Sequence, residues 1–330
     1  MVKSINPSLL TFPPPSIEES GHDVCYLGTN GQHNHNSVIY CNDLPEGQRA
    51  MVGSWYLHPE RHIIEYIVYV TLSLVTIRMI LPTLSQYPTT NNKLSSMKPP
   101  PWMKMTTFFI YIFQLVYKLN GYPGKILFMA MPCNVLWTMW VTLCFVPLQP
   151  QTLHIMHQLI IPYTSLAIVA VTAPDTSDLT MYMEVPFFFG MHIALILYPL
   201  YFLQSGRVSV YPLPSNNNKD NNKDRTYITN NDGLVRNFMK YWLLACAYFA
   251  AFYFGVATPL SLKYGLNLNY MLSPPPNPGN MVSGPNFRLQ STLCCGAAFF
   301  FVQFLVTAGE VFVRAMKGKS LELSVSKKSV

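Results

Sequence analysis

Long apolar segments alternate with shorter polar ones along most of the chain, and this pattern predicts a bundle of membrane helices. Each apolar segment is close to the ~20 residues that a helix needs to cross the hydrocarbon core of a bilayer. We expect seven spans, at about residues 63–81, 105–119, 126–146, 153–171, 181–203, 241–262 and 292–313. The predicted fold class is therefore all-α, a polytopic membrane protein with a bundle of about seven transmembrane helices.

The polar segments divide the chain into three parts. We expect a polar N-terminal tail at residues 1–60, a transmembrane domain at 61–315 and a basic tail at 316–330. Inside the transmembrane domain, residues 205–236 are rich in Asn, Lys and Asp. Such a segment has too few apolar residues to fold alone, so it is predicted to be a disordered linker.

The composition supports this interpretation and excludes others. Half of the 330 residues are hydrophobic and 11% are charged, whereas a soluble domain has roughly 25% charged residues. No interleaved basic and aromatic patch indicates nucleic-acid binding. The seven cysteines lack metal-site spacing, and no glycine-rich loop is present to bind phosphate, so we expect no metal and no cofactor.

The distribution of Lys and Arg predicts the orientation in the membrane. The side that holds the linker and the C-terminal tail carries most of the 22 basic residues and should face the cytosol. The N-terminus is then luminal or extracellular, where Cys25 and Cys41 can form a disulfide. The terminal Lys327-Lys328-Ser329-Val330 resembles a dilysine retrieval signal, which predicts the endoplasmic reticulum.

The segment Met131-Pro132-Cys133-Asn134 places a thiol beside a proline within the predicted third span. Proline removes a backbone donor and opens a helix locally. In lipid, such an opening persists where it is buried in protein or lines a cavity. Cys133 is thus a candidate nucleophile, although a lone Cys in an apolar helix is also a common packing residue.

A histidine and a glutamate in the fifth span lie at a similar depth. Cys133 is ~12 Å and His192 ~16 Å from the same side of the membrane, at 1.5 Å per residue. Glu184 lies two turns before His192, so both side chains can face one interior. An imidazole that accepts the thiol proton would activate Cys133. His192 can equally form a hydrogen bond between helices.

Other polar residues complete the candidate site or stay outside it. Asn134 lies beside the thiol and can bind a substrate carbonyl, whereas Thr138 and Thr142 fit better with helix–helix hydrogen bonds. Asn267 and Asn269 suit an ordered turn or a lid over the site. We read the pairs His154/His157 and Trp137/Trp140 as interfacial and as packing residues, respectively.

Several of these motifs resemble the transmembrane protein 164 family, in order, over about residues 55–315. Met131-Pro132-Cys133-Asn134 is similar to that family's Asn-Pro-Cys-His segment, and residues 267–272 to its Asn-Leu-Asn-Asn-Met-Leu run. Further similar segments are Pro59-Glu60-Arg61-His62 with Glu65, Tyr117-Lys118, and Glu184 to His192 followed by Tyr198-Pro199-Leu200-Tyr201.

The resemblance implies an acyltransferase that transfers fatty acyl chains, polyunsaturated ones in particular, to ether phospholipids. The family's Cys and His correspond to Cys133 and His192, and would transfer the acyl chain through a thioester. Asn134 and Tyr253 stand where the family has two other histidines. The expected partners are phospholipids, lysophospholipids and the bilayer. The alternatives are a membrane Cys/His lipid hydrolase and a non-catalytic seven-span receptor or transporter.

Overall fold

The computed structural model describes residues 24–25, 39–40, 59–84, 97–120, 125–174, 176, 179, 181–208, 210, 231–264, 268–271 and 286–328. Two short strands, β1 (Val24–Cys25) and β2 (Ile39–Tyr40), form an antiparallel pair. All other regular elements of the described chain are helices. Cys41, Asn267 and most of the predicted linker lie outside the described residues.

The predicted all-α membrane fold is confirmed. The long helices are α3 (Pro59–Ile80), α5 (Pro101–Leu119), α7 (Pro150–Thr172), α8 (Glu184–Gln204), α9 (Asn231–Phe252) and α11 (Phe287–Lys328). Among the described residues, five segments are long and apolar enough to cross a membrane, and these contain α3, α7, α8, α9 and the first part of α11. The count of seven stays a prediction, because α5 is outside this set and α6 (Pro132–Phe145) has 14 residues.

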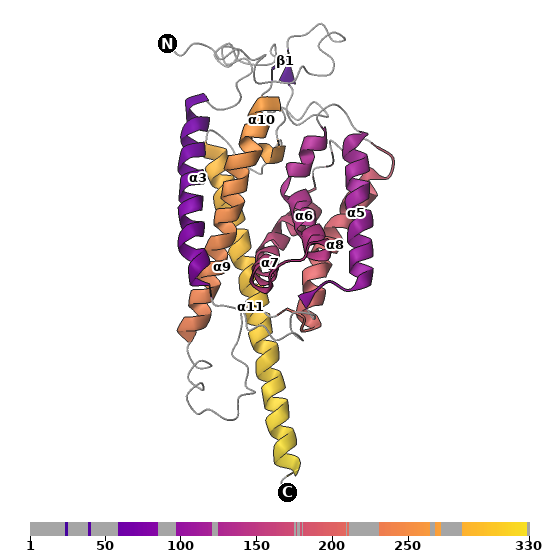
Figure 1. Ribbon diagram of the computed structural model, residues 1–330, viewed down its shortest axis with the longest axis vertical. Helices are drawn as coiled ribbons and strands as arrows, with labels where there is room; N and C mark the ends of the chain where they lie inside the picture. The colour runs from indigo at the N-terminus through magenta and orange to yellow at the C-terminus, as the bar shows by residue number, and fades with distance from the viewer. Residues whose placement is uncertain are drawn as a thin grey trace.

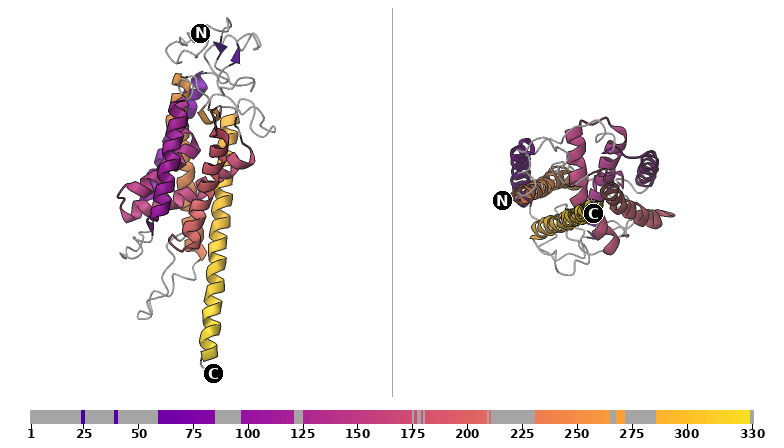
Figure 2. Two further views of the ribbon diagram at one scale, coloured as in Figure 1. Left: turned by 90° about the vertical axis from the view of Figure 1, so that its right-hand side faces the viewer. Right: turned by 90° about the horizontal axis from the view of Figure 1, so that it is seen from below.

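Contacts between helix ends show how the chain runs back and forth (Figure 1). Where α3 and α11 begin, Arg288 Nη1 lies 2.8 Å from Glu65 Oε2. At the opposite end of α3, Lys240 of α9 donates to the carbonyl of Thr83 at 2.7 Å. In Figure 2, the C-terminal part of α11 extends well beyond the other helices.

Proline begins four of the described helices and corrects one sequence prediction. Pro59, Pro101, Pro132 and Pro150 are the first residues of α3, α5, α6 and α7, where a missing backbone N–H costs nothing. The predicted third span is therefore not a continuous helix opened by Pro132. A 3-10 helix, η4 (Lys125–Ala130), is followed by Met131 in an extended conformation, which a residue before proline prefers.

The core between α6, α7 and α8 is aromatic. Trp137 and Trp140 are fully buried, and each contacts the ring of Tyr198 edge-on, at centroid distances of 5.7 and 5.3 Å. This agrees with the packing role predicted for both. The interfacial depth predicted for His154 and His157 stays a prediction, since both lie near the start of α7. Both side chains are buried in the bundle, where His157 Nε2 lies 3.1 Å from the carbonyl oxygen of Met97.

The helix after the linker changes its winding next to the candidate site. A π-helix, η6 (Tyr253–Ala257), joins α9 to α10 (Thr258–Tyr264), and the three form one long apolar segment. Such π turns often occur at functional sites. A short 3-10 helix, η7 (Leu268–Tyr270), follows, and a further one, η3 (Leu81–Thr83), ends the first helix.

Candidate functional site

A cavity of about 370 Å³ lies where α6, α7, α8 and α11 meet, next to η6 and η7. We call it the thiol cavity. It brings together every predicted site residue in the described part of the chain. These are Cys133, Asn134, Glu184, His192 and Asn269. The cavity of Cys133 thus includes the residues expected from depth in the membrane, although they come from separate segments of the chain.

The thiol lies at the start of a helix. Cys133 is the second residue of α6 and is half-buried. The N–H groups in the first turn of a helix have no acceptor within that helix, and this end of the helix dipole favours negative charge. Cys133 and Asn134 both belong to this turn. The site therefore offers backbone donors beside the sulfur, where a thiolate or an oxyanion would need them.

His192 is fixed in an orientation that leaves one ring nitrogen available. The side chain is 1% exposed, and Nδ1 lies 2.7 Å from the carbonyl oxygen of Phe188. Because a carbonyl only accepts, Nδ1 carries the proton of the neutral ring. Nε2 is buried and makes no hydrogen bond within the described residues. It therefore has a free lone pair, as a general base requires.

Asn134 joins the start of α6 to the preceding 3-10 helix. Its Nδ2 donates to the carbonyl of Phe128 at 2.6 Å, and its Oδ1 is buried without a hydrogen-bond partner in the described chain. Thr138 and Thr142 donate to carbonyls of their own helix, and Thr138 also contacts the hydroxyl of Tyr111 on α5 at 3.3 Å. Asn134 thus holds the turn that carries the thiol.

Glu184 is paired with lysine rather than with His192. Its carboxylate lies 2.8 Å from Lys125 Nζ and 4.0 Å from Lys118 Nζ, and it accepts from the backbone N–H of Met181 at 3.1 Å. The sequence pattern predicted a role for Lys118 and Lys125 in orientation, and for Lys118 in the family resemblance, but did not pair either with Glu184. The positions of the two lysines could have indicated this pairing. Both flank the turn on the side of the membrane where the fifth span begins, and a buried charge requires a partner.

The residues of η7 cover one side of the thiol cavity. Asn269 and Tyr270 both line the cavity and have positive φ angles of 49° and 60°, a conformation that Asn tolerates better than most residues. The hydroxyl of Tyr253 donates to the Asn269 carbonyl at 2.6 Å. Leu268 and Met271 are fully buried on either side. The turn is therefore anchored to the bundle at both ends.

The lining also includes residues that sequence reasoning did not select. Ser291, Cys294 and Cys295 reach the cavity from α11, and Ser165 from α7. Nothing in their spacing distinguished them from packing residues, because their role depends on which face of each helix meets the cavity. By contrast, Cys144 and the two buried histidines of α7 are not among the residues that line it.

The fold and the cavity define a class: a multi-pass helical membrane protein with a thiol and an imidazole in one cavity inside the bundle. A curated relative, "Transmembrane protein 164 homolog" from Dictyostelium discoideum, is 29% identical over 164 residues, which are 49% of this chain and 49% of the relative. The chain thus aligns with about half the length of that relative. The similarity confirms the resemblance to the transmembrane protein 164 family. No family model and no solved structure matches.

Proposed function

We propose that this protein is a phospholipid acyltransferase or transacylase, which moves a fatty acyl chain to a lysophospholipid through a thioester on Cys133. Ether lysophospholipids are among the acceptors that the family resemblance suggests. The observation that carries the proposal is the thiol cavity itself, in which Cys133 at the start of α6 and the free Nε2 of His192 line the same space.

The first half-reaction forms the thioester. Nε2 of His192 accepts the proton from Sγ of Cys133, and the thiolate attacks the carbonyl carbon of a phospholipid ester. A C–S bond forms, the ester C–O bond breaks, and the alkoxide takes the proton from His192 to leave as a lysophospholipid. Backbone N–H groups in the first turn of α6 are suited to bind the oxyanion that develops on the carbonyl oxygen.

The second half-reaction reverses this order with a different alcohol. Nε2 of His192 accepts the proton of an acceptor lysophospholipid hydroxyl, whose oxygen attacks the thioester carbon. The new C–O bond forms, the C–S bond breaks, and the proton returns to the thiolate of Cys133. No oxidant or reductant is needed, because the acyl group keeps its oxidation state throughout.

A position inside the membrane suits this exchange. Donor and acceptor are both lipids that reach the site laterally, and exclusion of water favours transfer over hydrolysis.

The second candidate function is a Cys/His lipid hydrolase, in which water replaces the acceptor alcohol. The same cavity supports it, and the identity of the acceptor distinguishes the two. A receptor or transporter would bind ligand without any acyl adduct.

We also propose that the protein resides in the endoplasmic reticulum with its C-terminus in the cytosol. The Lys327-Lys328 pair and the excess of basic residues on the side of the linker support this orientation. The start of α3 and the end of α11 lie at opposite ends of the molecule (Figure 1), which fits an odd number of crossings.

The decisive experiment uses purified protein and a phospholipid with a labelled acyl chain. Without acceptor, we expect a hydroxylamine-sensitive label on Cys133. Addition of a lysophospholipid should discharge this label into a new phospholipid. Release of labelled free fatty acid at the same rate with and without acceptor would indicate the hydrolase instead. Absence of both an adduct and turnover would overturn the enzymatic proposal.

A further inference from the structure

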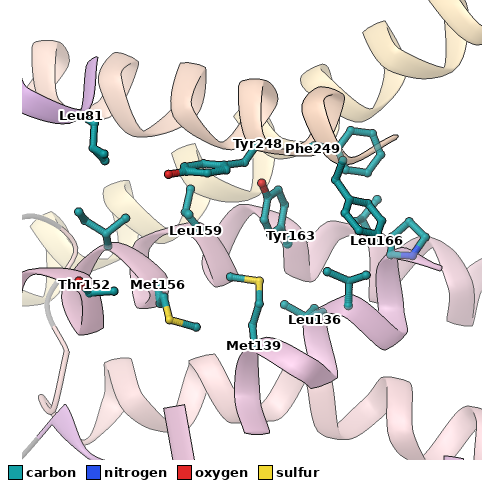
Figure 3. A pocket seen from close by; sticks show the side chains of 14 residues that line it. Leu81, Leu136, Met139, Thr152, Met156, Leu159, Tyr163, Leu166, Tyr248 and Phe249 are labelled. Carbon is teal, nitrogen blue, oxygen red and sulfur yellow. The ribbon is translucent and has the colours of Figure 1, made fainter. Parts of the chain in front are cut away.

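A second cavity, of about 430 Å³, lies between α6, α7 and α9 and reaches the end of α3 (Figure 3). We call it the apolar cavity. Its lining is aliphatic and aromatic apart from Thr152 and the hydroxyls of two tyrosines. One of these, Tyr163, donates to the carbonyl of Ala245 at 2.8 Å. The cavity therefore offers few polar groups to a ligand.

The apolar cavity adjoins the thiol cavity. Pro132 and Leu166 line both of them. Pro132 is bonded directly to Cys133, and Leu166 follows Ser165, which lines the thiol cavity. In Figure 3, Leu136 and Leu166 lie toward one end of the apolar cavity, and Leu81 and Thr152 toward the other. The thiol is thus next to one end of this cavity.

The length of the apolar cavity matches that of a lipid chain. Its lining on α7 extends from Leu166 to Thr152, fourteen residues and therefore ~21 Å at 1.5 Å per residue. One leaflet of a bilayer contributes about half of the ~30 Å hydrocarbon core. A fully extended acyl chain of ordinary length can therefore lie within the cavity.

The chemistry of the lining favours an alkyl chain over water or a polar ligand. Protein interiors are normally packed as densely as organic crystals, and an apolar cavity stays dry but accepts apolar molecules. Met139 and Met156 contribute flexible thioethers, which adapt to irregular apolar shapes. An apolar cavity of this size in a membrane protein is therefore expected to take up hydrocarbon.

We propose that the apolar cavity holds the fatty acyl chain that is transferred, with its carbonyl carbon next to Cys133 and its methyl end toward Leu81 and Thr152. This inference rests on the proposed function, because it assigns the thiol cavity to the ester. The length of the cavity then limits the length of the acyl chain, and the side chains halfway along the cavity select which acyl groups are transferred.

Two substitutions with opposite expected effects on the preference for chain length test this assignment. Met139→Trp adds bulk midway along the apolar cavity and should lower the kcat/KM for long chains relative to short ones by at least about tenfold, the scale of small steric changes in apolar pockets. Leu159→Ala enlarges the same region and should shift the preference toward longer chains. Ile168→Trp adds the same ring at a 38% exposed position of α7, outside the lining of both cavities, and should leave the preference unchanged.

Photocrosslinking supplies a readout that does not need turnover. A phospholipid with a diazirine near the methyl end of its acyl chain should label lining residues such as Thr152 and Met156, and Met139→Trp should suppress this labelling. Transfer with an unchanged chain preference and labelling in both cavity variants would overturn the inference while the enzyme survives. Labelling that Met139→Trp blocks, in a protein that never transfers acyl groups, would uphold the cavity assignment and overturn the proposed function.

The criterion for a folded variant is a monodisperse peak in size-exclusion chromatography. If Met139→Trp fails this criterion, Leu159→Ala and the crosslinking of the unaltered protein decide the question. Labelling of the unaltered protein confined to outward-facing positions such as Ile168 would then exclude the chain from the cavity.

Discussion

The carboxylate of Glu184 lies 2.8 Å from Nζ of Lys125, and the lysine side chain is completely buried. The two residues begin α8 and η4. Each precedes a proposed catalytic residue by the same eight positions, since Cys133 follows Lys125 and His192 follows Glu184. The ion pair therefore ties together the two segments that deliver the thiol and the imidazole to one cavity.

The buried ion pair predicts a large effect on stability. Lys125→Met leaves the Glu184 carboxylate without its nearest cation and should lower the free energy of unfolding by about 3–5 kcal/mol. The double variant Lys125→Met/Glu184→Gln removes both charges and should recover a large part of this loss. Denaturant unfolding in detergent micelles measures both values.

Lys118 is the matched control for this prediction. Its Nζ is 4.0 Å from Glu184, so Lys118→Met should cost clearly less than Lys125→Met. Equal losses for both lysines, or a double variant that is less stable than either single one, would contradict the assigned role of the pair.

The two cysteines of α6 form an internal comparison. Cys133 lines the thiol cavity, whereas Cys144 is buried at the other end of the same helix. Alanine at either position removes little volume and should cost little stability. We expect Cys133→Ala to abolish acyl transfer and Cys144→Ala to retain most of it, as measured with labelled phospholipid and a lysophospholipid acceptor. Full transfer by Cys133→Ala would end the nucleophile hypothesis.

Histidine substitutions separate chemistry from packing. His192→Ala removes the free Nε2 and should reduce acyl transfer at least about 100-fold, the usual contribution of a general base. His157→Ala removes the hydrogen bond to Met97 and should lower the melting temperature, while the folded protein keeps its activity. Activity per folded molecule, with folding followed by thermal scanning, distinguishes the two. Equal specific activities in both variants would leave His192 without a chemical role.

The C-terminus provides a test of orientation and location. A tag after Val330 should be accessible to antibody when only the plasma membrane is permeabilised, because the predicted tail is cytosolic. Lys327→Ser/Lys328→Ser should allow part of the protein to leave the endoplasmic reticulum, as followed by fluorescence microscopy. A tag that is protected until internal membranes are lysed would reverse the predicted topology.

The sequence alone determined the membrane class and the depth of the main candidates. Apolar runs of membrane-spanning length suffice for this, because backbone groups in lipid must be satisfied within helices. Depth follows from a constant rise per residue, so Cys133 and His192 were expected at one level before any contact was known. A shared depth in the membrane does not determine which faces of the helices pack against each other.

Only the tertiary structure decided how these residues are held and what surrounds them. Pro132 begins a helix instead of opening one, because η4 and the extended Met131 precede it. Glu184 turns to Lys125, and the histidines of α7 are buried among aromatic rings. These outcomes depend on the rotation and packing of whole helices, which arise from many weak contacts between distant segments. The apolar cavity has the same origin, since three helices and the end of a fourth supply its walls.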